Sequence, residues 1–254
     1  MEIAFYSEKC IDCGSCSQVC PNGAIRPDLR DRIDRQLCRS CEACSNECPT
    51  LALKKIGQYF RPDELVSILM KDKVFYKTSG GGVTFSGGEP MLYLDYLAKV
   101  MVALKNQGIH IALQTCGYFD FTLFRKEILP YLDLVFYDIK LIDSELHRKY
   151  TGRENHLILN NFKVLMKEAC IPVIPRVPLI TGITDGRNNI TGIVDFLNQS
   201  GCHTYNLLAY NPSGIFKRIY IGKTVSSLLT GTCLNSFSST CSLLISGVVG
   251  VYKD

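Results

Sequence analysis

The sequence predicts an α/β protein in which a small cysteine-rich module precedes a larger domain built on a parallel sheet, either a barrel or an open sheet. Two runs with the spacing C-x2-C-x2-C-x3-C-P predict the module. The first run starts at Cys10, and the second starts 28 residues later, at Cys38. Apolar strand-like segments then alternate with helix-like segments, which is the pattern of a parallel sheet with right-handed crossovers. The 254 residues are enough for one large α/β domain and a module of about 60 residues.

The cysteine runs are typical of iron–sulfur binding. Each run has four cysteines followed by a proline, as in bacterial two-cluster ferredoxins, where the fourth cysteine of each run binds the other cluster. We therefore expect two [4Fe–4S] clusters, and we expect each fourth cysteine to begin a short helix at its proline. The expected ligand sets are Cys10, Cys13, Cys16 and Cys48 for one cluster and Cys38, Cys41, Cys44 and Cys20 for the other.

Zinc ions or disulfide bonds would account for the repeat less well. Zinc sites prefer paired C-x2-C knuckles to four cysteines in a row with a trailing proline, and disulfides require an oxidising compartment. Residues 1–9 include Glu2, Glu8 and Lys9 and lack the long apolar core of a signal peptide. A reducing cytoplasm is therefore the expected location.

The segments after the module are predicted in turn from their local sequence. Residues 54–60 form a short joint, and a helix is expected to open at 61–64, with Pro62 in the first turn and acidic residues behind it. Apolar runs that end at glycine or polar residues predict strands at 83–85, 109–113, 134–137, 173–177 and 205–208. Amphipathic spacing predicts helices at 92–106, 121–129, 157–168 and 189–199.

Polar side chains gather directly after the predicted strands, as the functional residues of parallel α/β sheets do. They are Glu89, Thr115, Asp138, Lys140 and Asn211. Before Glu89 the strand runs into Gly87-Gly88, which allows the backbone to approach a ligand closely. Two interpretations of Glu89 stay open. Its carboxylate accepts hydrogen bonds from a cationic amine, or it stabilises a tight turn near the N-terminus of the next helix.

Several motifs follow the cysteine module in a fixed order. They are Gly87-Gly88-Glu89-Pro90, Tyr137-Asp138-Ile139-Lys140, the stretch 147–152, Asn155 with Ile158-Leu159-Asn160-Asn161, the stretch 176–185 and the stretch 206–211. In this order, over about residues 1–220, the chain resembles the activating enzymes of glycyl radical enzymes, which are radical S-adenosylmethionine (SAM) proteins. It is more similar to the relatives that carry a ferredoxin-type insert than to the pyruvate formate-lyase activase, which lacks one.

The resemblance implies a (β/α)6 barrel of the radical SAM type and a radical reaction. In that family SAM binds a further [4Fe–4S] cluster, one electron breaks its sulfonium–carbon bond, and the 5′-deoxyadenosyl radical removes a hydrogen from a glycine of the partner enzyme. The implied partners are a glycyl radical enzyme and a low-potential electron donor such as flavodoxin or ferredoxin. The SAM contacts implied by position are Gly87, Gly88, Glu89, Asp138, Ile139, Lys140, Arg176 and Asn211.

One motif of the family does not occur in the 254 residues. The cluster that binds SAM requires the spacing C-x3-C-x2-C, and none of the remaining cysteines has it: Cys116, Cys170, Cys202, Cys233 and Cys241. We therefore expect a truncated member of the family, with the first barrel strand missing and a third cluster available only from upstream sequence. Cys116 is expected to face the site, and Cys170 and Cys202 are expected to be buried. Two further interpretations stay open: an electron-transfer or SAM-binding subunit, and an inactive fragment.

The predicted domain boundaries are 1–57 for the two-cluster module, 58–222 for the partial barrel and 223–254 for an atypical tail. Residues 224–252 contain no charged side chain, but their many hydroxyl groups disfavour a membrane span. The net charge of +4 is small and diffuse, which disfavours nucleic-acid binding. Neither a membrane nor a nucleic acid is therefore expected among the partners.

Overall fold

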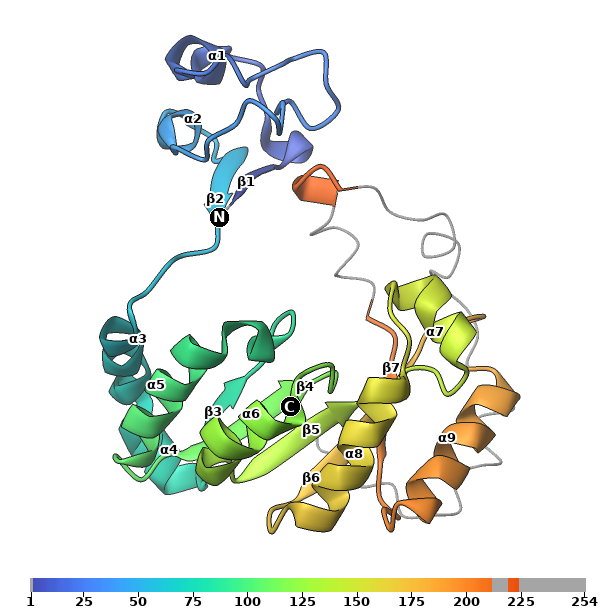
Figure 1. Cartoon of the computed structure of the whole chain (residues 1–254). Helices are drawn as coiled ribbons and strands as arrows, with labels where there is room; N and C mark the ends of the chain where they lie inside the picture. Colours follow the sequence, from blue (N-terminus) through green and yellow to red (C-terminus); the bar gives the residue numbers. More distant parts are fainter. Residues whose placement is uncertain (1, 212–218, 224–254) are drawn as a thin grey trace. The chain divides into compact units, whose positions relative to one another are not determined.

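The computed structural model describes residues 2–211 and 219–223, and these fall into two compact units (Figure 1). One unit contains residues 2–59 with residues 211 and 219–223, and the other contains residues 60–210. Within these ranges, no helix is both long and apolar enough to cross a bilayer. The uncharged stretch 224–252, which was predicted to form an atypical tail, lies outside the described residues.

The first unit contains a two-stranded antiparallel sheet that was not predicted from the sequence. Strand β1 (Glu2–Phe5) pairs with β2 (Leu53–Ile56), so that Glu2 lies opposite Ile56 and Phe5 opposite Leu53. The segment predicted as a joint, 54–60, therefore begins inside a strand. Its two lysines interrupt the apolar pattern, which is why the strand does not stand out in the sequence.

The short helices of the module precede the fourth cysteines and do not follow them. Helix α1 (Ser15–Val19) ends before Cys20, and α2 (Ala43–Asn46) ends before Cys48; a 3-10 turn, η1 (Ser7–Lys9), precedes both. The prediction that each helix begins at the proline is therefore wrong. A residue before proline is driven toward the extended conformation, and Cys20 accordingly has φ −76° and ψ 109°.

The repeat in the sequence is also a repeat of backbone conformation. Equivalent positions in its two halves adopt the left-handed conformation, which residues other than glycine seldom adopt. The pairs are Asp12 (φ 55°) and Ser40 (φ 53°), Gly14 (φ 76°) and Glu42 (φ 71°), and Gly23 (φ 59°) and Leu51 (φ 56°). The module therefore builds the same cysteine loop twice.

The module has a small hydrophobic core of its own. Its buried members are Ile3, Phe5, Ile25, Ile33, Cys44, Ala52 and Leu53. Five further cysteines are partly buried and pack against this core: Cys10, Cys16, Cys20, Cys38 and Cys48. Cysteine side chains therefore form much of the interior of the first unit.

The second unit contains the predicted parallel sheet. All five strands are parallel and lie in chain order, β3-β4-β5-β6-β7. They are β3 (Gly82–Phe85), β4 (His110–Thr115), β5 (Leu134–Asp138), β6 (Val173–Leu179) and β7 (Asn206–Ala209). Each predicted strand corresponds to one of these. The predicted fold class, an α/β protein with a partial barrel behind a ferredoxin-like module, is confirmed.

Helices connect the strands of the second unit. They are α3 (Pro62–Leu69), α4 (Lys73–Ser79), α5 (Leu94–Lys105), α6 (Phe121–Glu127), α7 (Ser144–Thr151), α8 (His156–Glu168) and α9 (Arg187–Gln199). Short 3-10 turns occur at η2 (Met70–Asp72), η3 (Pro90–Tyr93) and η4 (Leu129–Tyr131). The predicted helix 92–106 thus begins as the turn η3, and α4 and α7 were not predicted.

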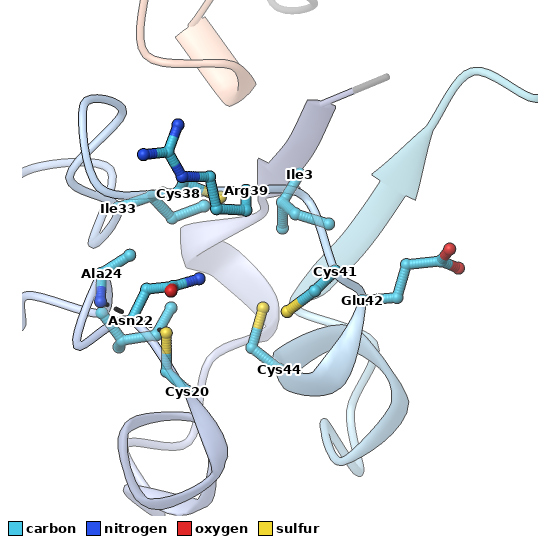
Figure 2. A pocket seen from close by; sticks show the side chains of 11 residues that line it. Ile3, Cys20, Asn22, Ala24, Ile33, Cys38, Arg39, Cys41, Glu42 and Cys44 are labelled. Carbon is cyan, nitrogen blue, oxygen red and sulfur yellow. Dashed lines mark hydrogen bonds between the residues drawn. The ribbon is translucent and has the colours of Figure 1, made fainter.

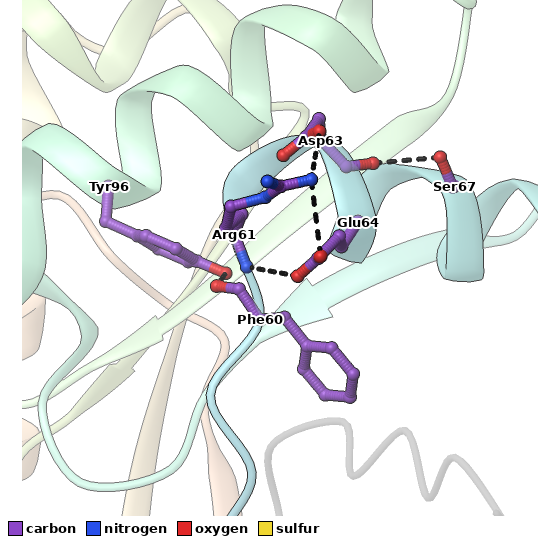
Figure 3. Close-up of polar contacts among 6 residues, drawn as sticks. All are labelled: Phe60, Arg61, Asp63, Glu64, Ser67 and Tyr96. Carbon is purple, nitrogen blue, oxygen red and sulfur yellow. Dashed lines mark hydrogen bonds and ion pairs between the residues drawn. The ribbon is translucent and has the colours of Figure 1, made fainter.

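Helix α3 begins where its proline predicts. The Glu64 carboxylate accepts a hydrogen bond from the backbone N–H of Arg61 at 2.9 Å, and the Arg61 guanidinium lies 3.2 Å from Asp63 and 3.3 Å from Glu64 (Figure 3). The hydroxyl of Tyr96, on α5, donates to the carbonyl of Phe60 at 2.9 Å. These contacts satisfy the first turn of α3 and tie its start to α5.

Alternation along the strands separates the two faces of the sheet. Ile111, Leu113, Val135, Tyr137 and Val177 are buried in one core with the helices. The residues between them on the opposite face are partly buried: Gln114, Phe136, Asp138 and Arg176. Gln114, Asp138 and Arg176 therefore share the face that does not pack into this core, whereas Thr115 lies on the core face and is buried.

Candidate functional site

The four cysteines predicted for the first cluster line one hollow of the module. Cys10, Cys13 and Cys16 come from the first run, and Cys48 comes from the second. Asp12 and Arg32 also line this hollow and form an ion pair with each other. The pairing of β1 with β2 is what brings the second run to the first.

The other four cysteines line a second hollow. Figure 2 shows Cys20 from the first run together with Cys38, Cys41 and Cys44 from the second. Two backbone N–H groups donate to these sulfurs: Ala24 to Cys20 at 3.2 Å and Ser40 to Cys38 at 3.4 Å. Each hollow is therefore lined by the first three cysteines of one run and the fourth cysteine of the other. These are the two ligand sets expected from the sequence.

The two hollows fit multi-iron clusters better than single ions. In the described part of the chain, no three Cys, His, Asp or Glu side chains converge closely enough to hold one metal ion. A cubane instead spreads its irons, so that each iron needs a single thiolate and the four sulfurs must surround it. Four thiols around a hollow, with amides donating to the sulfur atoms, match that requirement.

The environments of the thiols differ. Hydrogen bonds from the Ser15 side chain and backbone lower the pKa of the Cys13 thiol. Burial raises the pKa of the Cys44 thiol to about 11, and the nearby Cys38 and Cys20 thiols act in the same direction. A thiol with that pKa is protonated at neutral pH, so iron must displace a proton to bind it.

A second set of polar groups lies where the strands of the parallel sheet end. Glu89 follows β3, and its Oε1 accepts from the Thr115 hydroxyl at 2.8 Å and from the Met91 N–H at 3.2 Å. Its Oε2 accepts from the Cys116 N–H at 2.8 Å. The carboxylate therefore ties the turn after β3 to the end of β4 and also stabilises the start of η3. A carboxylate offers about four lone-pair sites; these three donors use most of them, and the Cys116 thiol is a fourth hydrogen-bond partner.

Two glycines leave the turn before Glu89 open. Gly87 has φ 123°, and a Cβ at either Gly87 or Gly88 would meet no atom within 4 Å. Cys116, at the end of β4, is close to Glu89, and burial together with this carboxylate raises the pKa of its thiol to about 11. The region therefore combines a carboxylate, a neutral thiol and uncovered backbone.

Asp138 and Arg176 lie opposite each other in the register of β5 and β6. Their side chains approach to 4.0 Å between Asp138 Oδ1 and Arg176 Nε. Both atoms are buried, and neither has a hydrogen-bond partner among the described residues. Burial raises the pKa of Asp138, while Lys140 and Arg176 oppose that shift. Buried polar atoms without partners are costly, so this pair is suited to a polar ligand.

Neighbouring side chains hold Arg176 in place. Its Nη1 donates to Gln114 Oε1 at 3.0 Å, and its guanidinium lies 5.3 Å from the centre of the Phe136 ring. Phe136 was not among the site residues predicted from the sequence. The signal was present, because alternation along β5 puts Phe136 on the same face as Asp138.

The other predicted SAM contacts have different surroundings. Ile139 is 1% exposed and its side chain belongs to the hydrophobic core, so a ligand can reach only its backbone. Lys140 is partly buried, and Asn211 is exposed two residues beyond β7. Cys202 is buried as predicted, but Cys170 is exposed, because it lies in the turn after α8 and not in the core. Cys233 and Cys241 lie outside the described residues.

The parallel sheet with polar strand ends, together with two four-cysteine hollows, defines the class of protein. Residues 3–26 match the family model of the 4Fe-4S binding domain, and residues 38–191 match that of the radical SAM superfamily. The chain is therefore a radical SAM iron–sulfur protein, and [4Fe–4S] clusters and SAM are its cofactors.

Its relatives identify the family more narrowly. The chain is 38% identical over 220 residues to the trans-4-hydroxy-L-proline dehydratase activating enzyme of Clostridioides difficile, covering 85% of this chain and 72% of that one. It is 35% identical over 231 residues to the isethionate sulfite-lyase activating enzyme of Desulfovibrio desulfuricans, covering 88% and 74%. The chain belongs to the family of glycyl-radical enzyme activating enzymes.

A solved domain of a pyruvate-formate lyase-activating enzyme from Bacteroides vulgatus is also similar to this chain. It shares 31% identity, covers 61% of this chain and 91% of that domain, and superposes with a TM-score of 0.48. The radical SAM family match and the activating enzymes that share more than 30% identity with the chain confirm the predicted enzyme class, an oxidoreductase of the radical SAM type. The protein substrate of this family is a glycyl radical enzyme.

Proposed function

We propose that the open face of the parallel sheet binds SAM and that the two cysteine hollows hold the clusters that deliver electrons for its cleavage. When bound and reduced by one electron, SAM supplies a carbon radical that removes a hydrogen atom from a glycine of the partner enzyme. The remaining task of this chain is to bind and orient SAM and to exclude water from it.

The observation that carries the SAM site is the buried pair formed by Asp138 and Arg176. Asp138 offers a carboxylate oxygen without a partner, suited to the ribose hydroxyls, and Arg176 offers an N–H suited to the methionine carboxylate. Glu89 offers its carboxylate to the cationic methionine amino group, which would displace the weak thiol donor of Cys116, and Gly87-Gly88 leave room for its approach. We include Lys140, the backbone of Ile139 and Asn211 as further contacts.

The electrons require a donor of low potential. We propose a small one-electron carrier such as flavodoxin or ferredoxin, because the two hollows together offer eight thiols to clusters of the ferredoxin type. A reducing cytoplasm would keep these thiols available. The proposed ligands are Cys10, Cys13, Cys16 and Cys48 in the first hollow and Cys20, Cys38, Cys41 and Cys44 in the second.

Asp138→Asn is expected to weaken SAM binding by about tenfold or more. A hydrogen bond to a charged group contributes about 1.5–3 kcal/mol, and 1.4 kcal/mol is a factor of ten. Anaerobic calorimetric titration of the iron-loaded protein with SAM measures the change. Glu154→Gln is the matched control, because Glu154 is an exposed acid on a loop. Equal affinities for Asp138→Asn and the wild type, or no binding by the wild type, would contradict the proposed site.

A second candidate function is SAM binding or electron transfer without radical chemistry by these 254 residues. The observation in its favour is that no three of their cysteines have the spacing C-x3-C-x2-C. The same samples separate the two functions after reduction. Release of 5′-deoxyadenosine from SAM supports the radical reaction, and binding without release supports the second candidate.

The exchange of fourth cysteines between the runs predicts a specific pattern of iron loss. Replacing Cys10, Cys13 and Cys16 by serine is expected to reduce the iron from about eight to about four per chain. In that background Cys48→Ser should remove no further iron, whereas Cys20→Ser should remove the second cluster. Iron and sulfide analysis of the purified variants measures this. The opposite order, with Cys48→Ser removing the remaining iron, would assign each fourth cysteine to its own run.

A further inference from the structure

Hydroxyl groups lie beside sulfur atoms of the first hollow. The Ser17 hydroxyl interacts with Cys16, and two further hydroxyls have contacts of known distance. Ser15 Oγ is 3.5 Å from Cys13 Sγ, and Thr50 Oγ1 is 3.8 Å from Cys48 Sγ. A sulfur that binds iron carries no proton and can only accept a hydrogen bond, so both hydroxyls become donors when a cluster is bound. Ser15 belongs to the first half of the repeat and Thr50 to the second, yet both act on the same hollow because the fourth cysteines are exchanged.

The second hollow has no hydroxyls at the positions equivalent to Ser15 and Thr50, and Ser45, the equivalent of Ser17, donates to the Glu42 carbonyl at 2.9 Å. The repeat of 28 residues places Ala43 where the first half has Ser15, and Asn22 where the second half has Thr50. Ala43 has no polar side chain. Asn22 lines the second hollow (Figure 2), but among the described residues it makes no hydrogen bond to any of the four sulfurs there.

Backbone N–H groups also donate to sulfurs in both hollows. Ser15 donates to Cys13, Ser17 to Cys16, and Leu53 and Ala52 to Cys48 in the first hollow. Ala24 donates to Cys20 and Ser40 to Cys38 in the second. The backbone donors therefore favour the first hollow in the same direction as the hydroxyls.

The charged lining residues are balanced in the two hollows, although in the first Asp12 Oδ1 lies 4.0 Å from Cys10 Sγ, where the Arg32 guanidinium pairs with it. Each is lined by one acidic and one basic residue, Asp12 with Arg32 in the first and Glu42 with Arg39 in the second. The formal charges of the lining residues cancel in both. The hydroxyls therefore act together with the backbone donors of the first hollow, and they are the part that a side-chain substitution can remove.

We propose that Ser15 and Thr50 raise the reduction potential of the cluster held by Cys10, Cys13, Cys16 and Cys48 above that of the other cluster. Reduction adds one negative charge to a cluster, and donors to its sulfurs stabilise that charge. The first electron that a low-potential donor delivers to the module therefore comes to rest on this cluster. The inference depends on the proposed ligand assignment.

Anaerobic redox titration followed by electron paramagnetic resonance tests the inference. The wild type is expected to show two midpoints. Ser15→Ala combined with Thr50→Val should lower the higher midpoint and leave the lower one in place. Removal of each hydroxyl is expected to lower the midpoint by up to about 59 mV, which changes the ratio of reduced to oxidised cluster at a fixed potential about tenfold for a one-electron couple. Thr50→Ser keeps the hydroxyl and should keep the wild-type midpoint.

Ala43→Ser is the matched variant in the other half of the repeat. It places a hydroxyl two residues after Cys41, as Ser15 stands two residues after Cys13, and it should raise the lower midpoint. Two results would overturn the inference and leave the ligand assignment intact. One is a double variant with full iron whose higher midpoint has not moved, and the other is a single midpoint for both wild-type clusters. Wild-type iron well below about eight per chain would overturn the ligand assignment and the inference with it.

Discussion

Removal of iron from the protein is expected to unfold residues 2–59 and to leave the parallel sheet of residues 60–210 folded. A domain of about 60 residues buries only about 60% of the surface of its unfolded chain and is marginally stable without staples. Here the core has seven buried residues, one of which is Cys44, and five more cysteines pack against it. Once the clusters are removed, nothing crosslinks these thiols, and metal-binding free energy is lost from folding.

Hydrogen exchange read by mass spectrometry distinguishes the two units. After anaerobic chelation, the amides of β1 and β2 should lose protection, whereas those of β4 and β5 should keep it, because the sheet has a large core of its own. Cys44→Ser, which removes only the second cluster, should reduce the protection of β1 and β2 in part without a chelator. Cys170→Ser is the matched control, since Cys170 is exposed and lies in the second unit. Protection of β1 and β2 that survives complete iron removal would contradict the prediction.

The cysteine spacing predicted more than the presence of clusters. The exchange of Cys20 and Cys48 between the runs implies which thiols share a hollow, and the two hollows are lined accordingly. The spacing could not predict β1, because Glu2–Phe5 is a strand only by virtue of its partner Leu53–Ile56. Nor could it locate α1 and α2, since their ends are decided by the conformation that each Cys-Pro pair imposes.

The sheet was predictable because its strands are buried apolar runs that end in polar residues. What the sequence could not provide is the side-chain geometry across neighbouring strands. The contact between Arg176 and Gln114 depends on the register of three strands, and the 4.0 Å approach of Asp138 and Arg176 depends on two. Glu89 illustrates the same limit. Both interpretations of its carboxylate were left open, and its contacts with Met91, Thr115 and Cys116 show that the turn-stabilising one applies.

Gly117→Ala is expected to destabilise the second unit by about 3 kcal/mol or more. Gly117 has φ 78°, which costs a residue with a Cβ about 1–2 kcal/mol. The added Cβ would also overlap the hydroxyl and ring of Tyr137, which is fully buried and donates to the Ile158 carbonyl at 2.7 Å. Overpacking of this kind costs about 1–3 kcal/mol, and the buried hydrogen bond of Tyr137 would be lost as well.

The same substitution is expected to disturb the SAM site, because Gly117 supports the chain of contacts that positions Glu89. The Gly117 N–H donates to Thr115 Oγ1 at 3.0 Å, and that hydroxyl donates to Glu89 at 2.8 Å. Chemical denaturation measures the loss of stability, and SAM titration measures the effect on the site. Gly186→Ala is the matched control, since φ there is −61° and a Cβ would meet no atom within 4 Å. It should change stability by less than about 1 kcal/mol. Equal unfolding midpoints for the two variants would mean that the turn after β4 yields to the added methyl group, and that Gly117 does not hold Thr115 and Glu89 in place.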